Sequence, residues 1–161
     1  EILSGLVGSE MCIRDSATFA GATESIRHIL GDNGVTTVGL TMFDASGLSL
    51  KNRVSSHTLV DVLRLSATQD QNRAILDDLP VSGGSGTLSN RFYDGSLARG
   101  WVRAKTGTLS SASSLAGIVV TRDGRVLVFA FIINGEEPSA ARPVLDALAT
   151  SLQACGCQPA H

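Results

Sequence analysis

The chain has 161 residues with 13 basic and 15 acidic side chains, a formal net charge of −2, and the length of one compact domain. Its hydrophobic fraction of 43% argues against intrinsic disorder, and its near-neutral charge argues against a nucleic-acid-binding domain, which normally carries an excess of basic residues. Only two of the basic residues are lysines, Lys51 and Lys105, so any lysine-dependent chemistry has two candidates.

The first sixteen residues, EILSGLVGSEMCIRDS, stand apart from the rest of the chain. The tract Val7–Asp15 resembles translated sequencing-adapter DNA fused to a gene fragment, and the alternative is an ordinary N-terminal segment. We therefore predict a non-native segment at 1–16, the C-terminal part of a longer domain at 17–157, and a tail at 158–161. No apolar run reaches the roughly 18 residues that span a membrane, so no transmembrane segment is expected in this chain.

The N-terminal half is predicted to be mostly helical. Apolar residues three and four apart predict a helix from Ala17 to Leu30 that ends at Gly31. The run 38–43 is typical of a short buried strand, and 44–49 of a loop. A second helix is expected at 57–65, capped by Ser55 or Ser56.

A third helix at 72–79, stopped by Pro80, and a flexible loop at 82–86 complete this half.

The C-terminal half is predicted to contain a β-sheet followed by a helix. Residues 101–106, 113–121 and 125–134 read as strands, and Asp123-Gly124 predicts a tight hairpin turn between the last two. A helix at 140–154 is expected to begin after Ser139 as its N-cap. Its inward face is predicted to be Val144, Leu145, Leu148 and Leu152. The fold class is therefore α+β, an antiparallel sheet with packed helices.

The triplet Lys105-Thr106-Gly107 lies at the end of a predicted strand. An ammonium group attracts a carboxylate, a threonine hydroxyl can donate a hydrogen bond to it, and a glycine lets a neighbouring backbone approach closely. Such a triplet suits a ligand that ends in a carboxylate and lies along a strand edge. On its own it also fits a strand that ends in a turn glycine.

Three blocks of sequence make the triplet more informative. They are Asp44–Ser49 followed by Asn52, Leu79–Leu88 followed by Arg91, and Arg103–Leu109 followed by Ser114–Gly117. Together they resemble the D-alanyl-D-alanine carboxypeptidase/endopeptidase family, the class C low-molecular-mass penicillin-binding proteins. The resemblance extends over nearly all of 17–157. It implies the C-terminal part of a serine penicillin-binding, β-lactamase-like transpeptidase domain that acts on peptidoglycan stem peptides.

The resemblance also implies a role for each site residue. Ser49 would relay a proton, Asn52 would hold the substrate backbone, and Lys105 would support the relay and attract the substrate carboxylate. Gly107 completes the Lys-Thr-Gly motif. The hydroxyls of Thr106 and Thr108 would bind the substrate carboxylate. The Thr108 N–H would complete an oxyanion hole.

One departure concerns the Ser-x-Asn motif of the family. The order here is Ser49-Leu50-Lys51-Asn52, so either Asn52 or Lys51 fills that position, and we favour Asn52.

The nucleophile motif of the family, Ser-x-x-Lys, is not found in these 161 residues. The residue three before Lys51 is Leu48, and the residue three before Lys105 is Val102. We therefore predict that penicillin does not acylate this polypeptide alone. Two other functions stay open: a β-lactamase or esterase-type hydrolase with the same Lys-Thr-Gly wall, and a catalytically dead domain that binds peptidoglycan.

Acyl transfer needs only a serine, its base and oxyanion donors, so no metal or organic cofactor is implied, and no Cys-x-x-Cys pair suggests a zinc site. The implied partners are the stem peptide and, for the full-length protein, β-lactams. The location implied by the substrate is extracytoplasmic, in the periplasm or cell-wall space. His28 and His57 are expected to be exposed or capping residues, and Cys155 and Cys157 to be either disulfide-bonded or thiols.

Overall fold

The structure is a computed structural model that describes residues 18–93 and 95–155, in two compact units, Glu1–Val62 and Leu63–His161. Each unit is described by itself. The predicted non-native segment at 1–16, the tail at 158–161 and Cys157 lie outside the described residues.

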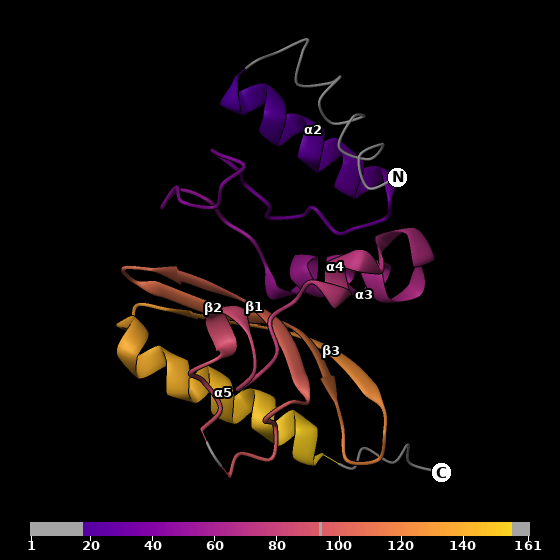
Figure 1. Cartoon of the computed structure of the whole chain (residues 1–161). Helices are drawn as coiled ribbons and strands as arrows, with labels where there is room; N and C mark the ends of the chain where they lie inside the picture. Colours follow the sequence, from indigo (N-terminus) through magenta and orange to yellow (C-terminus); the bar gives the residue numbers. More distant parts are fainter. Residues whose placement is uncertain (1–17, 94, 156–161) are drawn as a thin grey trace. The chain divides into compact units, whose positions relative to one another are not determined.

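The first unit contains helix α2 (Phe19–Asp32) and the start of helix α3 (Ser56–Thr68), which continues into the second unit (Figure 1). The hydroxyl of Thr18 caps α2 by accepting a hydrogen bond from the Gly21 N–H at 3.1 Å. Ser55 caps α3, because its Oγ accepts from the Thr58 N–H at 3.0 Å. Both predicted helices are confirmed, and each ends two or three residues later than expected.

The strand predicted at 38–43 is wrong. Only Thr41 is paired, through a single antiparallel bridge to Arg53, and Val38 is 82% exposed. The physical reason is Gly39, whose φ of +77° turns the chain within the run. The Leu40 N–H then donates to the Thr37 carbonyl at 3.0 Å, which closes a turn where an extended strand was expected.

The segment that leads to the sheet differs from the prediction in two ways: it contains less helix, and its loop is more ordered. The helix expected at 72–79 consists of a 3₁₀ turn, η1 (Asp70–Asn72), and one α-helical turn, α4 (Ala74–Asp77). The loop at 82–86 is not the flexible segment that its glycines suggested, because Ser82 is almost fully buried. The Ser82 hydroxyl donates to the Ala98 carbonyl at 2.6 Å, and this hydrogen bond fixes the start of the loop. The loop continues into the 3₁₀ turn η2 (Gly86–Leu88).

The second unit is built on a three-stranded antiparallel sheet of order β1-β2-β3 (Figure 1). The strands are β1 (Val102–Leu109), β2 (Ala112–Val120) and β3 (Val126–Asn134). The predicted hairpin turn between β2 and β3 is confirmed, with Gly124 at φ +81° and the Thr121 N–H donating to the Arg125 carbonyl at 2.8 Å. The α+β prediction is confirmed as well.

Helix α5 (Pro138–Ala154) packs on the sheet, mainly against β2 (Figure 1). The helix begins at Pro138, because proline has the φ angle of a first helical residue and lacks only an N–H that the helix does not need there. Ser139 is therefore inside the first turn, and the prediction that it is the N-cap is wrong. The buried face repeats every four residues through Ala141, Leu145 and Ala149.

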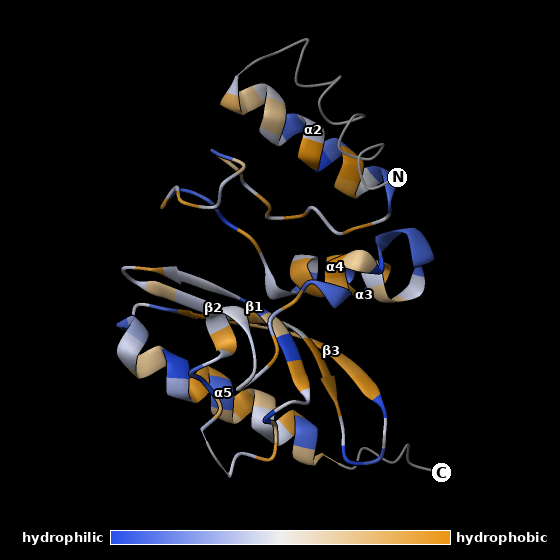
Figure 2. Cartoon of the chain, in the orientation of Figure 1, coloured by the Kyte–Doolittle hydropathy of each residue, from blue (hydrophilic) through white to orange (hydrophobic). Residues whose placement is uncertain are grey.

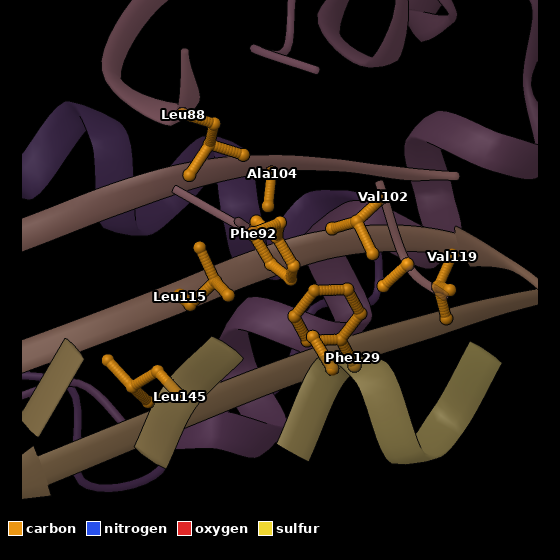
Figure 3. Packing of buried hydrophobic residues seen from close by; sticks show 10 residues of the cluster. Leu88, Phe92, Val102, Ala104, Leu115, Val119, Phe129 and Leu145 are labelled. Atoms are coloured by element: carbon orange, nitrogen blue, oxygen red, sulfur yellow. The ribbon is translucent and has the colours of Figure 1, made fainter. Parts of the chain in front are cut away.

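The core of the second unit fills the space between the sheet and α5, as Figure 3 shows. Hydrophobic side chains of the sheet pack against Leu145 there. Figure 2 shows that β3 is hydrophobic along almost its whole length. Val144 and Leu148, which the sequence placed inward with Leu145 and Leu152, are 50% and 40% exposed. The buried members of the cluster are Leu88, Phe92, Ala98, Val102, Ala104, Leu115, Val119, Phe129, Leu145 and Ala149.

Candidate active site

Strand β1 presents its site residues on two faces. Alternation along a strand places Lys105 and Gly107 on one face and Thr106 and Thr108 on the other. Thr106 pairs with Leu115, a fully buried member of the core, so the Thr106 side chain is on the face that carries α5. Lys105 is exposed on the opposite face, and its Nζ donates to the Thr106 carbonyl at 2.6 Å. This hydrogen bond holds the ammonium group beside the backbone of β1.

The outer edge of β1 is covered only along its first half. The Ala104 N–H donates to the Pro80 carbonyl, and the Ser82 N–H to the Val102 carbonyl, each at 2.9 Å. Backbone groups of alternate residues point to the same edge, so those of Thr106 and Thr108 point outward too. Within the described residues of the second unit, no hydrogen bond joins either of these two amides to a segment outside the sheet. This half of the edge can pair with an extended peptide.

Gly107 lies against a hydroxyl that the sequence did not reveal. A Cβ built on Gly107 would collide with the Ser114 Oγ, the side chain directly across on β2. The missing side chain therefore makes room for a hydroxyl of the neighbouring strand, in addition to any close approach of a ligand backbone. Ser114 shares its face with Lys105 and Gly107, so the sheet surface beside the lysine carries a second polar group.

A second hydroxyl missed by the sequence lies beside Thr106. The Thr106 hydroxyl donates to the Thr87 Oγ1 at 3.0 Å, although the two residues are 19 positions apart. Thr87 lies in η2, next to the fully buried Leu88. The only sequence signal was that Thr87 belongs to the block Leu79–Leu88 used for the family resemblance.

The two site residues of the first unit, Ser49 and Asn52, lie together in one loop. Asp44 organises it: its carboxylate accepts from the Gly47 N–H at 2.8 Å, the Ser49 N–H at 2.7 Å and the Asn52 Nδ2 at 3.0 Å. The hydrogen bond from Asn52 is the largest cause that lowers the pKa of Asp44 below its ordinary value.

The Asn52 side-chain amide forms hydrogen bonds within the loop through both of its polar atoms. Its Nδ2 donates to Asp44, and its Oδ1 accepts from the Phe43 N–H at 2.7 Å. The Ser49 Oγ accepts from the Lys51 N–H at 3.3 Å, and the Lys51 Nζ lies 5.5 Å from the centroid of the Phe43 ring. The choice between Asn52 and Lys51 for the Ser-x-Asn position stays a prediction. Thus the structure brings together Ser49 and Asn52 in one loop, and Lys105, Thr106, Gly107 and Thr108 on one strand.

Other polar residues have structural partners. Arg91, which follows the Leu79–Leu88 block, forms a two-pronged ion pair with Asp146 of α5, at 2.5 and 3.1 Å. His28 is exposed as expected, and its hydrogen bond with Asp32 is the largest cause that raises its pKa. His57 is also exposed and lies 3.6 Å from the Asp61 carboxylate.

Across residues 18–93 and 95–155, no group of three or more histidine, cysteine or acidic side chains could hold a metal ion. None of the helices in this part of the chain is long and apolar enough to cross a membrane.

Comparison with known proteins identifies relatives for almost the whole chain. The model of the D-Ala-D-Ala carboxypeptidase 3 (S13) family matches residues 2–155. Carboxypeptidase DacB of Mycolicibacterium smegmatis is 47% identical over 145 residues, which cover 87% of this chain and 31% of the relative. Carboxypeptidase Rv3627c of Mycobacterium tuberculosis is 42% identical over 163 residues, which cover 97% and 35%.

The solved structures agree with this result. Penicillin binding protein 4 (dacB) of Haemophilus influenzae, complexed with a β-lactam, has a TM-score of 0.75 and 27% identity over 84% of this chain and 34% of that one. The α+β fold of the chain therefore matches that of the solved protein. The chain spans about a third of the length of the curated relatives that it matches.

Proposed function

Because the chain belongs to the D-Ala-D-Ala carboxypeptidase 3 (S13) family, we propose that it is the C-terminal part of a serine-type D-Ala-D-Ala carboxypeptidase/endopeptidase. Its substrates would be peptidoglycan stem peptides, cleaved through an acyl-enzyme intermediate. The observation that carries this proposal is the uncovered half of the β1 edge, where outward-pointing backbone groups of Thr106 and Thr108 lie beside the Lys105 ammonium.

The chemistry of the substrate explains why such an edge is useful. A stem peptide that ends in D-Ala-D-Ala is extended and carries a C-terminal carboxylate. Its backbone can pair with β1, while Lys105 from one face of the strand and the Thr106 hydroxyl from the other attract the carboxylate at the strand edge. Pairing fixes the penultimate carbonyl at one position along the strand, so the reacting bond is oriented before any covalent step.

The N–H of Thr108 would then stabilise the tetrahedral intermediate. When the nucleophile attacks the penultimate carbonyl, negative charge develops on its oxygen, and an N–H aimed at that oxygen lowers the barrier. Loss of one such donor typically slows acyl transfer by about 10²–10³-fold. In this proposal, Ser49 relays a proton with the support of Lys105, and Asn52 binds the substrate backbone.

The nucleophile itself comes from outside these 161 residues in this proposal, because neither lysine is preceded by a serine at the required spacing. The acylated protein would therefore be a longer one. Its partners would be the stem peptide and, as for the Haemophilus protein, β-lactams. Its site of action would be extracytoplasmic, where peptidoglycan lies.

A chimera tests the proposal. Residues 17–155 would replace the matching segment of the Mycolicibacterium carboxypeptidase, to which this chain is 47% identical over 145 residues. We expect the chimera to release D-alanine from a D-Ala-D-Ala peptide and to hold labelled penicillin as a stable adduct detected by mass spectrometry. We expect the 161-residue chain alone to form no adduct.

The controls distinguish the other functions. Lys105→Gln in the chimera should abolish D-alanine release without unfolding the protein. Rapid turnover of penicillin would instead favour a β-lactamase-type hydrolase. A folded chimera that binds the peptide but releases no D-alanine would contradict the proposal and favour a peptidoglycan-binding domain.

A further inference from the structure

We propose that Thr87 is a positioning residue for the substrate carboxylate, and that it acts through the hydroxyl of Thr106. This inference rests on the proposed function, in which Thr106 binds the C-terminal carboxylate of the peptide. It starts from the hydrogen bond in which the Thr106 hydroxyl donates to the Thr87 Oγ1 at 3.0 Å. Thr106 belongs to the uncovered half of the β1 edge, and its hydroxyl meets that of Thr87 on the face of the sheet that carries α5.

The position of Thr87 is fixed by its neighbours on both sides. Leu88, the next residue, is fully buried in the core of the second unit. Its carbonyl accepts from the Gly83 N–H at 2.9 Å, and its N–H donates to the Ser85 carbonyl at 3.1 Å. The Thr87 side chain is therefore attached to a turn that the core holds in place, although Thr87 itself is exposed.

The turn is also fastened to β1. The Ser82 Oγ accepts from the Val102 N–H at 3.2 Å and donates to the Ala98 carbonyl. Gly86, with φ +51°, lies against Pro80, where an added Cβ would meet the proline Cγ at 3.0 Å. Because the same segment pairs with the first half of β1, the spacing between Thr87 and the strand is set by hydrogen bonds and by close packing.

The two hydroxyls can exchange roles when a carboxylate binds. A hydroxyl has one proton to donate and two lone pairs to accept. In the structure, the Thr106 proton is directed to Thr87. Donation from Thr106 to a carboxylate requires that proton to rotate toward the ligand, and the Thr87 proton can then turn to the Thr106 oxygen. The Thr106 oxygen keeps a partner throughout.

The reversed bond should strengthen carboxylate binding. A hydroxyl that accepts one hydrogen bond becomes a better donor for the next, so Thr87 would polarise Thr106 toward the ligand. A single neutral hydrogen bond of this kind corresponds to about a 3- to 10-fold change in affinity. The effect should depend on the charge of the ligand, because a neutral amide end gains less from a polarised donor than a carboxylate does.

The test uses the 161-residue chain labelled with ¹⁵N and two probes, N-acetyl-D-Ala-D-Ala with a free carboxylate and the same peptide as its C-terminal amide. Affinities at pH 7 come from the titration of the Thr106 and Thr108 amide signals. We expect tighter binding of the carboxylate peptide by the unchanged chain. Thr87→Val should weaken that binding about 3- to 10-fold and leave amide binding unchanged, and Thr87→Ser should restore it.

A control variant is Thr68→Val, on the exposed end of α3, which should bind both peptides as the unchanged chain does. If the unchanged chain does not prefer the carboxylate, the proposed function fails. If the preference exists and Thr87→Val keeps it, the role of Thr87 is refuted while the proposed function stands. Equal weakening for both peptides, or no recovery with Thr87→Ser, would mean a purely structural residue and would also overturn the inference.

Discussion

The two groups of candidate site residues are held in place by different kinds of interaction. In the first unit, Ser49 and Asn52 lie in an exposed loop ordered by hydrogen bonds to Asp44, and every partner is within nine residues in sequence. In the second unit, Lys105–Thr108 belong to a strand that is paired along its length and backed by a hydrophobic core.

The difference predicts how each group responds to disturbance. A segment held by a few exposed hydrogen bonds opens locally at little cost, whereas a strand that pairs with its neighbour along its whole length and packs on the core opens at a higher cost. The strand residues should therefore resist local opening better than the loop residues do. The loop should depend on one carboxylate and on pH.

The largest effect is expected at Gly117 of β2, which faces Ala104 across the strands. A Cβ there would collide with the Arg103 carbonyl oxygen and lie 2.6 Å from the Ala104 Cα. Both obstacles are backbone atoms, which cannot move without breaking the β1–β2 pairing. We expect Gly117→Ala to destabilise the second unit by about 3 kcal/mol or more, measured by urea unfolding.

Gly84→Ala is the matched control, because a Cβ there meets Val81 only at 3.5 Å, an ordinary contact. Its effect should stay within about 0.5 kcal/mol. Equal unfolding midpoints for the two variants would show that close packing does not hold the strand.

An intermediate effect is expected at the ion pair of Arg91 and Asp146. Both side chains are mostly buried, so Asp146→Ala leaves the guanidinium without that carboxylate and, among the described residues, with only the Arg142 carbonyl at 3.4 Å as an acceptor. We expect a loss of about 2 kcal/mol in the free energy of unfolding. The double variant Arg91→Met with Asp146→Ala should recover part of it, because it removes the uncompensated charge. A double variant less stable than the single one would argue against this cause.

The smallest effect on stability, confined to the loop, is expected at Asp44. Asp44→Asn removes the charge that three donors share, so hydrogen exchange at the Gly47 and Ser49 amides should accelerate about ten-fold or more. Exchange in β2 should not change. If the two loop amides exchange at the rate of the unchanged chain, Asp44 does not order the loop.

The pH dependence of the loop follows from the same carboxylate. The pKa of Asp44 is lowered in the folded chain, chiefly by the Asn52 hydrogen bond, so its contribution is complete above the unfolded pKa. That contribution is lost as the pH falls through the lowered pKa of the folded chain. The Gly47 amide shift should report this midpoint, and Asn52→Ala should move it upward toward the ordinary value.

The same contrast explains what the sequence could predict. The sheet and its hairpin were predictable because alternation and Asp123-Gly124 are local signals. The run 38–43 misled because a positive φ at Gly39 outweighed its apolar composition. The register of α5 could not be read either, because the buried face is set by Ala141 and Ala149 against the sheet, and small residues give a weak hydrophobic signal.

Some residues of the candidate site could likewise be found from the sequence, and others could not. The strand residues Lys105–Thr108 were found from a motif within one stretch of chain. Thr87 and Ser114 were not found, because each acts through a contact with a residue on another element that only the fold brings close. Asp44 belongs to the block Asp44–Ser49 that carries part of the family resemblance. Its three hydrogen bonds nevertheless depend on a loop conformation that composition alone does not specify.

The most direct test of the account asks whether Lys105 makes the β1 edge a carboxylate-binding surface. Arg103→Gln is the matched control, because Arg103 is also cationic, exposed and on the same face of the same strand. The binding of N-acetyl-D-Ala-D-Ala to the chain would be compared for Lys105→Gln and Arg103→Gln by amide titration. The account predicts about a ten-fold loss for Lys105→Gln and little change for Arg103→Gln. Equal losses, or unchanged binding by Lys105→Gln, would contradict it.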